Sequence, residues 1–541
     1  AAQEENSALS SLEDYMITDG SYNKETGVNE PRLLSGMKEV MFKLPSGSDK
    51  GQAIKQGETG FNESNWYDYK KSYWANAVTE DGSYWVWIPR FAYKITYKNA
   101  SDKSQGGKVE IKFLLGTTDE YYTDDTNTTK ATAKRASSAN EEVDTTKDFY
   151  VHPAFTNESS IGYANGGWDK ELTGIWVAKF EAGYASGNNT ATVKASSVNY
   201  SQQYGWVSAK ESGVDGNNYP ARNWLDGTYG TKVNGNWGWK NGQQTAIKYP
   251  TFQPKTYSMN YINVNDAYNV SKVLTEKGNI YGLSSSTTDS HLMKNSEWGA
   301  VAYLAQSSYG NNGTEPYVNN VTLNGGSRQR TDDIAGGTGV DSVYAVTGVT
   351  TGSISAGAAG STIGNINSTT GNTANSGVYT WDQEDGQKSS STLNMYGVFD
   401  MSGGVWERTA GYTANGNWNL VGYGASLTDS RQRTTSTKYV TVYPHNADDK
   451  DNTSKTIDQL SQANYEQNKY IYGDAIRETS MSGTGSTSWN GDYSYFPALN
   501  YPFTARGGYL WDGSGAGLFC FNRTNGGSGY NGGFRPVLVA L

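Results

Sequence analysis

Aromatic and β-branched residues gather in two short stretches that predict β-strands. Residues 81–97, DGSYWVWIPRFAYKITY, open with a turn signal and continue as a strand pattern. Because proline lacks a backbone N–H, Pro89 predicts a sheet edge or a bulge within this strand. Residues 174–185, GIWVAKFEAGYA, predict a second strand. Between them, residues 117–147 are rich in Thr, Asp, Asn and Ala and predict an exposed loop or a polar hairpin.

Apolar residues at helical spacing predict a few helices. Residues 1–20 form an N-terminal helix in this prediction, either a short amphipathic helix packing on its own domain or the end of a longer one. Two main helices follow, at 263–278 with Asn265 as the N-cap and at 294–310. A weaker pattern covers 456–465.

Glycine-rich and polar sequence fills most of the remainder. Residues 336–377 have a Gly/Ser/Thr/Asn/Ala texture that is typical of long surface loops. The patterns together predict an α+β fold with an irregular, mainly antiparallel sheet, two main helices and long loop insertions. We divide the chain into the helix at 1–20, a β-rich region at 21–150 and a further domain at 151–541.

Composition narrows the classes of function. The chain has 541 residues, a net charge of −10, one cysteine and three histidines. These values argue against a nucleic-acid partner, internal disulfides and a zinc site. The net charge fits a soluble, secreted or surface protein. No stretch approaches a membrane span and no signal peptide is recognisable, so we expect any export or anchoring segment to lie before Ala1.

Several motifs, in order along the chain, resemble the formylglycine-generating-enzyme superfamily. They are GIWVAKFEAG, NVNDAYNVSKVL, HLMKNSEWGAVAYLAQ, NMYGVFDMSGGVWERTAGY at 394–412, ARGGYLWDG and GGFRPVL. The YGVFDMSGGVWE wording carries most of this resemblance, which implies a C-type-lectin-like fold over about residues 85–541. In such a fold Asp and Asn oxygens can coordinate calcium, although no ligand set is placed here and no other cofactor is expected.

The same motif has a structural interpretation. Gly403 and Gly404 allow tight turns, Trp406 is expected to be buried, and Asp400 and Glu407 are expected to serve the scaffold, Glu407 by accepting from backbone donors. The superfamily's oxidase uses two cysteines, whereas this chain has only Cys520. An enzyme of this type is therefore the least favoured hypothesis, and we expect no catalytic residues.

Residues 505–536 are similar to the variable segment of retroelement-diversified proteins, in which adenine positions are rewritten. The frame positions of this resemblance are Arg506, Gly507, Gly508, Phe534 and Arg535. The varied positions, which the resemblance implies contact a ligand, are Tyr509, Leu510, Trp511, Asp512, Ser514, Cys520, Asn522, Arg523, Thr524, Asn525, Ser528, Tyr530 and Asn531. Tyr, Trp, Ser, Asn and Gly are also the residues that antibody binding loops favour. The alternative is that the aromatic residues of the segment, Trp511 and Phe519 more than Tyr509 and Tyr530, fill a loop-rich core.

The first residues, AAQEENSALSSLEDY, look like the end of the N-terminal helix of pilin-like proteins from Gram-positive bacteria. These resemblances favour a cell-surface or pilus-associated adhesin that binds a protein or glycan on another surface, with self-assembly through the N-terminal helix. A phage tail receptor-binding protein is the alternative.

Overall fold

The computed structural model describes residues 22–183, 249–323, 345–355, 377–527 and 531–541, apart from 257, 260 and 261. It also describes five short strand pieces at 231–233, 236–238, 328–329, 340–341 and 364–366. The N-terminal helix predicted for 1–20 and most of the low-complexity stretch 336–377 lie outside the described residues.

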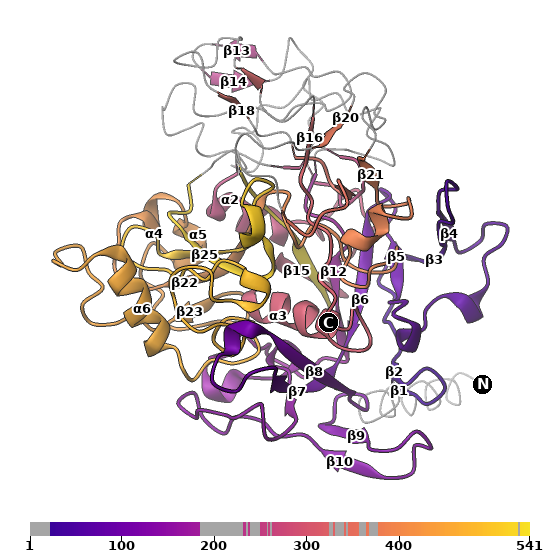
Figure 1. Ribbon diagram of the computed structural model, residues 1–541, viewed down its shortest axis with the longest axis horizontal. Coiled ribbons are helices and arrows are strands. Elements are labelled where there is room, and N and C mark those ends of the chain that lie inside the picture. The colour runs from indigo at the N-terminus through magenta and orange to yellow at the C-terminus, as the bar shows by residue number, and fades with distance from the viewer. Residues whose placement is uncertain are drawn as a thin grey trace.

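A seven-stranded antiparallel sheet forms the centre of the molecule (Figure 1). Its order is β15 (Thr288–Leu292), β27 (Pro536–Ala540), β12 (Gly174–Ala178), β6 (Tyr84–Pro89), β5 (Asn76–Val78), β3 (Lys38–Lys43) and β4 (Gln52–Lys55). Every residue of β6 and β12 is buried, which explains why both stretches are continuously apolar rather than alternating. Strands from both sides of residue 150 pair in this sheet, so regions 21–150 and 151–541 share one core.

The edge predicted from Pro89 is wrong. Strand β6 lies between β5 and β12, and Pro89 is its last residue, opposite Gly174. The missing N–H therefore ends the strand, and the chain turns into a second, three-stranded sheet of order β11 (Tyr150–Val151), β7 (Phe91–Tyr97) and β8 (Gly107–Phe113). The polar stretch 117–147 contains the predicted hairpin, formed by β9 (Glu120–Tyr122) and β10 (Lys130–Thr132).

A third sheet carries the C-terminal segment. Its path is β23 (Thr441–Tyr443), β22 (Trp406–Thr413), β24 (Phe503–Gly507) and β25 (Gly517–Thr524), with β26 (Gly532–Phe534) pairing parallel to β22. The β22–β24 and β24–β25 pairings are antiparallel and both contain a register shift. Short two-stranded pairs complete the described strands: β1 (Tyr22–Asn23) with β2 (Val28–Asn29), β13 (Thr231–Val233) with β14 (Asn236–Gly238), β16 (Val321–Leu323) with β20 (Gly364–Ile366), β17 (Arg328–Gln329) with β18 (Val340–Asp341), and β19 (Val349–Thr350) with β21 (Tyr379–Thr380).

Three helices of nine or more residues occur in the described part of the chain, and they correspond to the two main helices and the weaker pattern at 456–465 that the sequence predicted. They are α2 (Val264–Lys272), α3 (Asn295–Gln306) and α6 (Ile457–Gln467). Asn263 rather than Asn265 caps α2, because its side-chain oxygen accepts from the Asp266 N–H. Two single turns, α4 (Asn419–Gly422) and α5 (Ala425–Thr428), follow β22.

Helix α2 packs between β15 of the seven-stranded sheet and β22 of the C-terminal sheet, and α3 packs between β22 and β8 of the three-stranded sheet (Figure 1). Every residue of α3 is buried, as expected for a helix covered on all sides. The core around it contains the fully buried tryptophans Trp74, Trp85, Trp87, Trp168, Trp176, Trp298 and Trp489. The fold is therefore α+β with mostly antiparallel sheets, as predicted.

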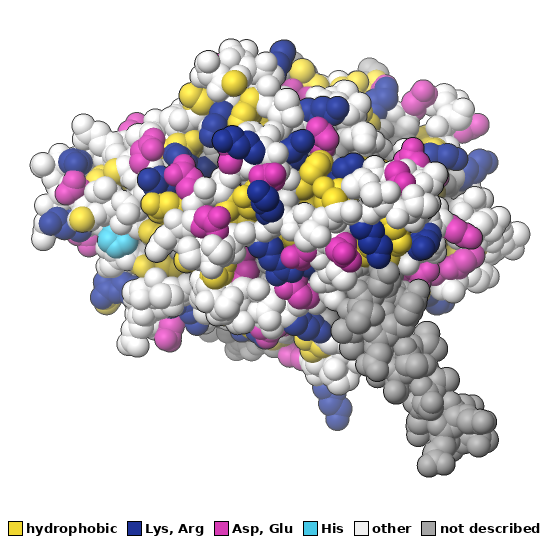
Figure 2. Space-filling model, turned by 90° about the horizontal axis from the view of Figure 1, so that it is seen from below, with side chains coloured by type: hydrophobic (Ala, Val, Ile, Leu, Met, Phe, Trp, Pro, Cys, Tyr) yellow, Lys and Arg dark blue, Asp and Glu magenta, His cyan; other side chains and the backbone are white. Residues whose placement is uncertain are grey.

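The surface carries mixed charge. On the face shown in Figure 2, acidic and basic side chains are interspersed, with hydrophobic ones scattered among them. This face therefore carries no large patch of acidic side chains alone or of basic side chains alone.

Candidate ligand-binding face

Arg506 anchors the start of the 505–536 segment. The side chain, on β24, is fully buried. Its Nε donates to the Cys520 carbonyl at 2.8 Å, Nη1 to the Asp474 carbonyl at 2.7 Å and Nη2 to the Ala475 carbonyl at 2.8 Å. One guanidinium thereby joins β24, β25 and the loop before η11 (Arg477–Thr479), which fixes the backbone from which the varied positions project.

The two glycines that follow Arg506 make a turn that other residues would strain. Gly507 and Gly508 have φ of +86° and +85°. A Cβ on Gly508 would lie 2.5 Å from Ala516. Glycine is therefore required here by both conformation and space.

Arg535 anchors the end of the segment, and Phe534 before it is fully buried. Arg535 is buried, and its Nε donates to Glu407 Oε1 at 2.7 Å, with further bonds to the Ala178 and Phe399 carbonyls at 2.9 and 2.8 Å. The prediction that Glu407 accepts from backbone donors is wrong, because its carboxylate pairs with this arginine. Burial raises the pKa of Glu407, and the Arg535 charge opposes that rise.

The rest of the 396–407 motif is scaffold, as expected, with one exception. Asp400 has φ of +64° and accepts from Asn319 Nδ2 and from the Gly348 N–H, each at 2.9 Å. Gly403 and Gly404 have φ of +79° and +71°. Trp406 is only partly buried, contrary to the prediction, because it lies at the start of β22 beside Trp511.

Three varied positions are buried and do not face solvent. Tyr509 is 4% exposed, and Leu510 and Cys520 are 0% exposed. Tyr509 and Leu510 pack with Val405 and Ala345, which agrees with the alternative that part of the segment fills a core. Burial raises the pKa of the Cys520 thiol well above its usual range, and nearby Asp492 adds to this, so the thiol is neutral and shielded.

The remaining described varied positions are at least partly exposed. They are Trp511, Asp512, Ser514, Asn522, Arg523, Thr524, Asn525 and Asn531, whereas Ser528 and Tyr530 lie outside the described residues. We name these eight the exposed set.

One part of the exposed set consists of Trp511, Asp512 and Ser514. The ring of Trp511 meets that of Tyr509 edge-on, with centroids 6.2 Å apart. Asp512 accepts from the Tyr509 N–H at 2.7 Å, and burial raises its pKa to about 6. The single-turn helix η13 (Gly513–Gly515) then presents Ser514 to solvent.

The other part lies at the end of β25, where side chains order their own backbone. Thr524 Oγ1 accepts from the Gly526 N–H at 3.1 Å, and Asn525 Oδ1 from the Gly527 N–H at 2.9 Å. Arg523 pairs with Asp458 of α6 at 2.8 Å. In this chain these contacts add local order to a backbone that the buried arginines already position, and pre-organisation of this kind lowers the entropy cost of binding.

Several neighbours of the exposed set were missed by sequence reasoning. The Arg523 guanidinium lies 5.1 Å from the centroid of the Tyr495 ring, and its Nη1 donates to Ser461 Oγ at 2.8 Å. Ser461 precedes Arg523 by 62 residues, so no local pattern could have indicated the contact.

Among the described residues, no group of three or more His, Cys, Asp or Glu side chains is placed to hold a metal ion. Within the same ranges, no helix has the length and apolar character needed to cross a bilayer. No protein-family model matches the chain, and no curated protein matches it.

Proposed function

We propose that this chain is a bacterial cell-surface or pilus-associated binding protein whose C-terminal segment forms a diversified ligand-binding face on a C-type-lectin-like fold. The observation that carries the proposal is the contrast in burial within residues 505–536. All five frame positions are buried, whereas eight of the eleven described varied positions are at least partly exposed.

The difference in burial between frame and varied positions has a physical explanation. Buried arginines that bond to backbone carbonyls fix the main chain regardless of which side chains project from it. Aromatic, Asn, Ser and Thr side chains at the surface then provide contact area and adaptable hydrogen bonds. The buried, neutral thiol of Cys520 supports a binding role over thiol catalysis.

A pair of displayed libraries tests the division into frame and face. In the first, Trp511, Asn522, Arg523, Thr524 and Asn525 are randomised together on the yeast surface and sorted for binding to lysozyme. In the matched control library, the five frame positions are randomised instead. We expect the first library to retain folded display and to yield binders, and the second to lose folded display. Equal loss of folding in both libraries would refute the division.

An adhesion assay tests the biological role. Beads coated with the protein are incubated with panels of bacterial and epithelial cells. We expect the wild-type beads to adhere to at least one cell type. The double substitution Trp511→Ala and Asn522→Ala should reduce this adhesion at least tenfold, whereas Thr126→Ala, in the distant β9–β10 turn, should have no effect. Undiminished adhesion by the double variant, or no adhesion to any cell type, would contradict the proposal.

A further inference from the structure

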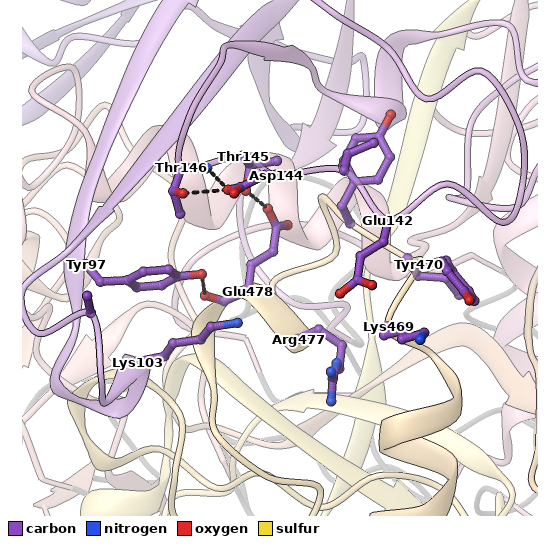
Figure 3. Close-up of a pocket in the computed structure, with 14 residues that line it drawn as sticks. Tyr97, Lys103, Glu142, Asp144, Thr145, Thr146, Lys469, Tyr470, Arg477 and Glu478 are labelled. Atoms are coloured by element: carbon purple, nitrogen blue, oxygen red, sulfur yellow. Dashed lines mark hydrogen bonds between the residues drawn. The ribbon is translucent and has the colours of Figure 1, made fainter.

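A second surface feature is a pocket of about 500 Å³ that lies outside the 505–536 segment. Tyr97 at the end of β7, Lys103 of η4 (Lys103–Gln105), the loop at 142–146, the loop after α6 and Arg477 of η11 enclose it (Figure 3). This volume is within the range of small-molecule sites. Its lining comes from parts of the chain that are distant in sequence.

The deepest acid of the pocket is fully engaged by the protein. The Glu478 carboxylate accepts from the hydroxyls of Tyr93, Tyr303 and Thr145 at 2.6–3.0 Å and from the Gly473 N–H at 2.6 Å. A carboxylate with this many donors is held in place, and its oxygens have little capacity left to accept hydrogen bonds from a ligand.

Another carboxylate of the wall is also engaged. Asp144 accepts from the Thr146 N–H at 2.9 Å and the Thr146 hydroxyl at 2.5 Å, and it faces Lys147 at 3.7 Å (Figure 3). These contacts occupy its oxygens within its own loop, although its charge still acts on Lys103.

The cations of the pocket make fewer close bonds to the protein than its acids do. Burial lowers the pKa of Lys103, and the positive charge of Arg477 lowers it further, with Glu478, Asp144 and Glu142 opposing the shift. Arg477 pairs only loosely with exposed Glu466, at 3.6 Å. Two partly desolvated cations that repel each other are stabilised by an anion bound near both.

Both cationic heads are held in position. The Arg477 guanidinium lies 4.1 Å from the centroid of the Tyr465 ring, and the Lys103 ammonium lies 5.5 Å from that of Tyr97. In Figure 3 the Lys103 ammonium lies on one side of the Arg477 side chain and Lys469 on the other. Such pre-organisation favours binding of a charged oxygen group.

The remaining walls suit a ring-shaped, hydroxylated ligand. Tyr97 and Tyr470 lie at opposite sides of the pocket (Figure 3), and Tyr472 also lines it. Their rings offer apolar faces with polar edges. Glu142 extends its carboxylate into the space from the rim and can accept hydrogen bonds from hydroxyl groups (Figure 3).

We propose that this pocket binds an acidic saccharide, with Lys103 and Arg477 on its carboxylate or sulfate, a tyrosine ring against the sugar, and Glu142 on its hydroxyls. The site is separate from the 505–536 face, so it does not depend on the function proposed above.

Calorimetric titration of the full chain tests this site. The ligands are glucuronate, N-acetylglucosamine 6-sulfate, neutral glucose and N-acetylglucosamine, and inorganic sulfate. We expect at least one acidic sugar to bind tenfold or more tightly than its neutral parent and than inorganic sulfate. Lys103→Met and Tyr470→Ala should each weaken that binding at least fivefold. Lys134→Met, which removes the same charge from an exposed lysine outside the pocket, should not.

Three results would overturn the proposal. One is equal affinity for acidic and neutral sugars, which would make the cations irrelevant. Another is inorganic sulfate binding as tightly as the sugar, which would make the rings irrelevant. The third is wild-type affinity in Lys103→Met, provided that thermal unfolding shows the variant to be folded.

Discussion

Replacing Arg535 by methionine is the sharpest test of the buried frame. The substitution keeps most of the apolar stem and removes a charge that is fully buried. Glu407, 1% exposed, loses its cation at 2.6 Å, and the carbonyls of Ala178 and Phe399 lose a donor. Breaking a buried ion pair from one side costs about 3–5 kcal/mol, and each carbonyl left without a donor adds about 1 kcal/mol or more. We therefore expect a loss of about 5 kcal/mol, comparable to the whole stability of many domains.

Urea denaturation followed by tryptophan fluorescence measures this loss, with Asn522→Ala as a control from the exposed set. The control should change the unfolding free energy by no more than about 0.5–1 kcal/mol. Adding Glu407→Gln to Arg535→Met removes the uncompensated charge, so the double variant should regain about 2 kcal/mol over Arg535→Met. A loss below about 1 kcal/mol for Arg535→Met, or a double variant that is less stable still, would refute this account of the frame.

Three further outcomes follow from other buried groups. Cys520 should react with a thiol reagent about a hundredfold more slowly in the native protein than in urea, and equal rates would show that it is accessible. Burial lowers the pKa of His291, but the carboxylates of Glu297 and Asp289, each 2.7 Å from the imidazole ring, raise it to about 9. The protonated His291 therefore stabilises the fold fully below pH 6.5, and this contribution to the unfolding free energy is lost as pH rises through 9. The difference in unfolding temperature between wild type and His291→Gln should therefore shrink across that interval, and a constant difference would exclude the effect. Lys179→Met leaves three acceptors at 2.6–2.8 Å without their donor and should cost about 2–4 kcal/mol by urea denaturation, whereas a neutral effect would contradict those bonds.

The regular elements were predictable because their signals are local. Continuous apolar runs predicted β6 and β12, and helical spacing predicted α2, α3 and α6. The position of Pro89 was misjudged because sequence does not tell whether a strand continues past a proline or ends there. The weaker pattern at 456–465 became a full helix because its Thr456 cap and Gln459 form a capping box.

The candidate face was predictable only in outline. The segment 505–536 and its frame could be recognised, but which varied positions reach the surface depends on packing with distant residues. Leu510 is covered by Val405 and Ala345, and Cys520 lies in the interior of β25. The partners of Arg523, by contrast, come from α6 and from Tyr495, which no spacing rule links to it.

Strand β27 pairs with both β15 and β12, and this position limits which changes in the 505–536 coding sequence still give a folded protein. The strand that follows residue 535 is central, not peripheral, so the chain completes its main sheet only after the whole of 505–536 has been translated in frame. If the segment is rewritten as proposed, a copy that acquires a stop codon or a frameshift lacks this strand and cannot fold. The fold would thus select against faulty copies, since only segments that keep the reading frame yield a stable protein.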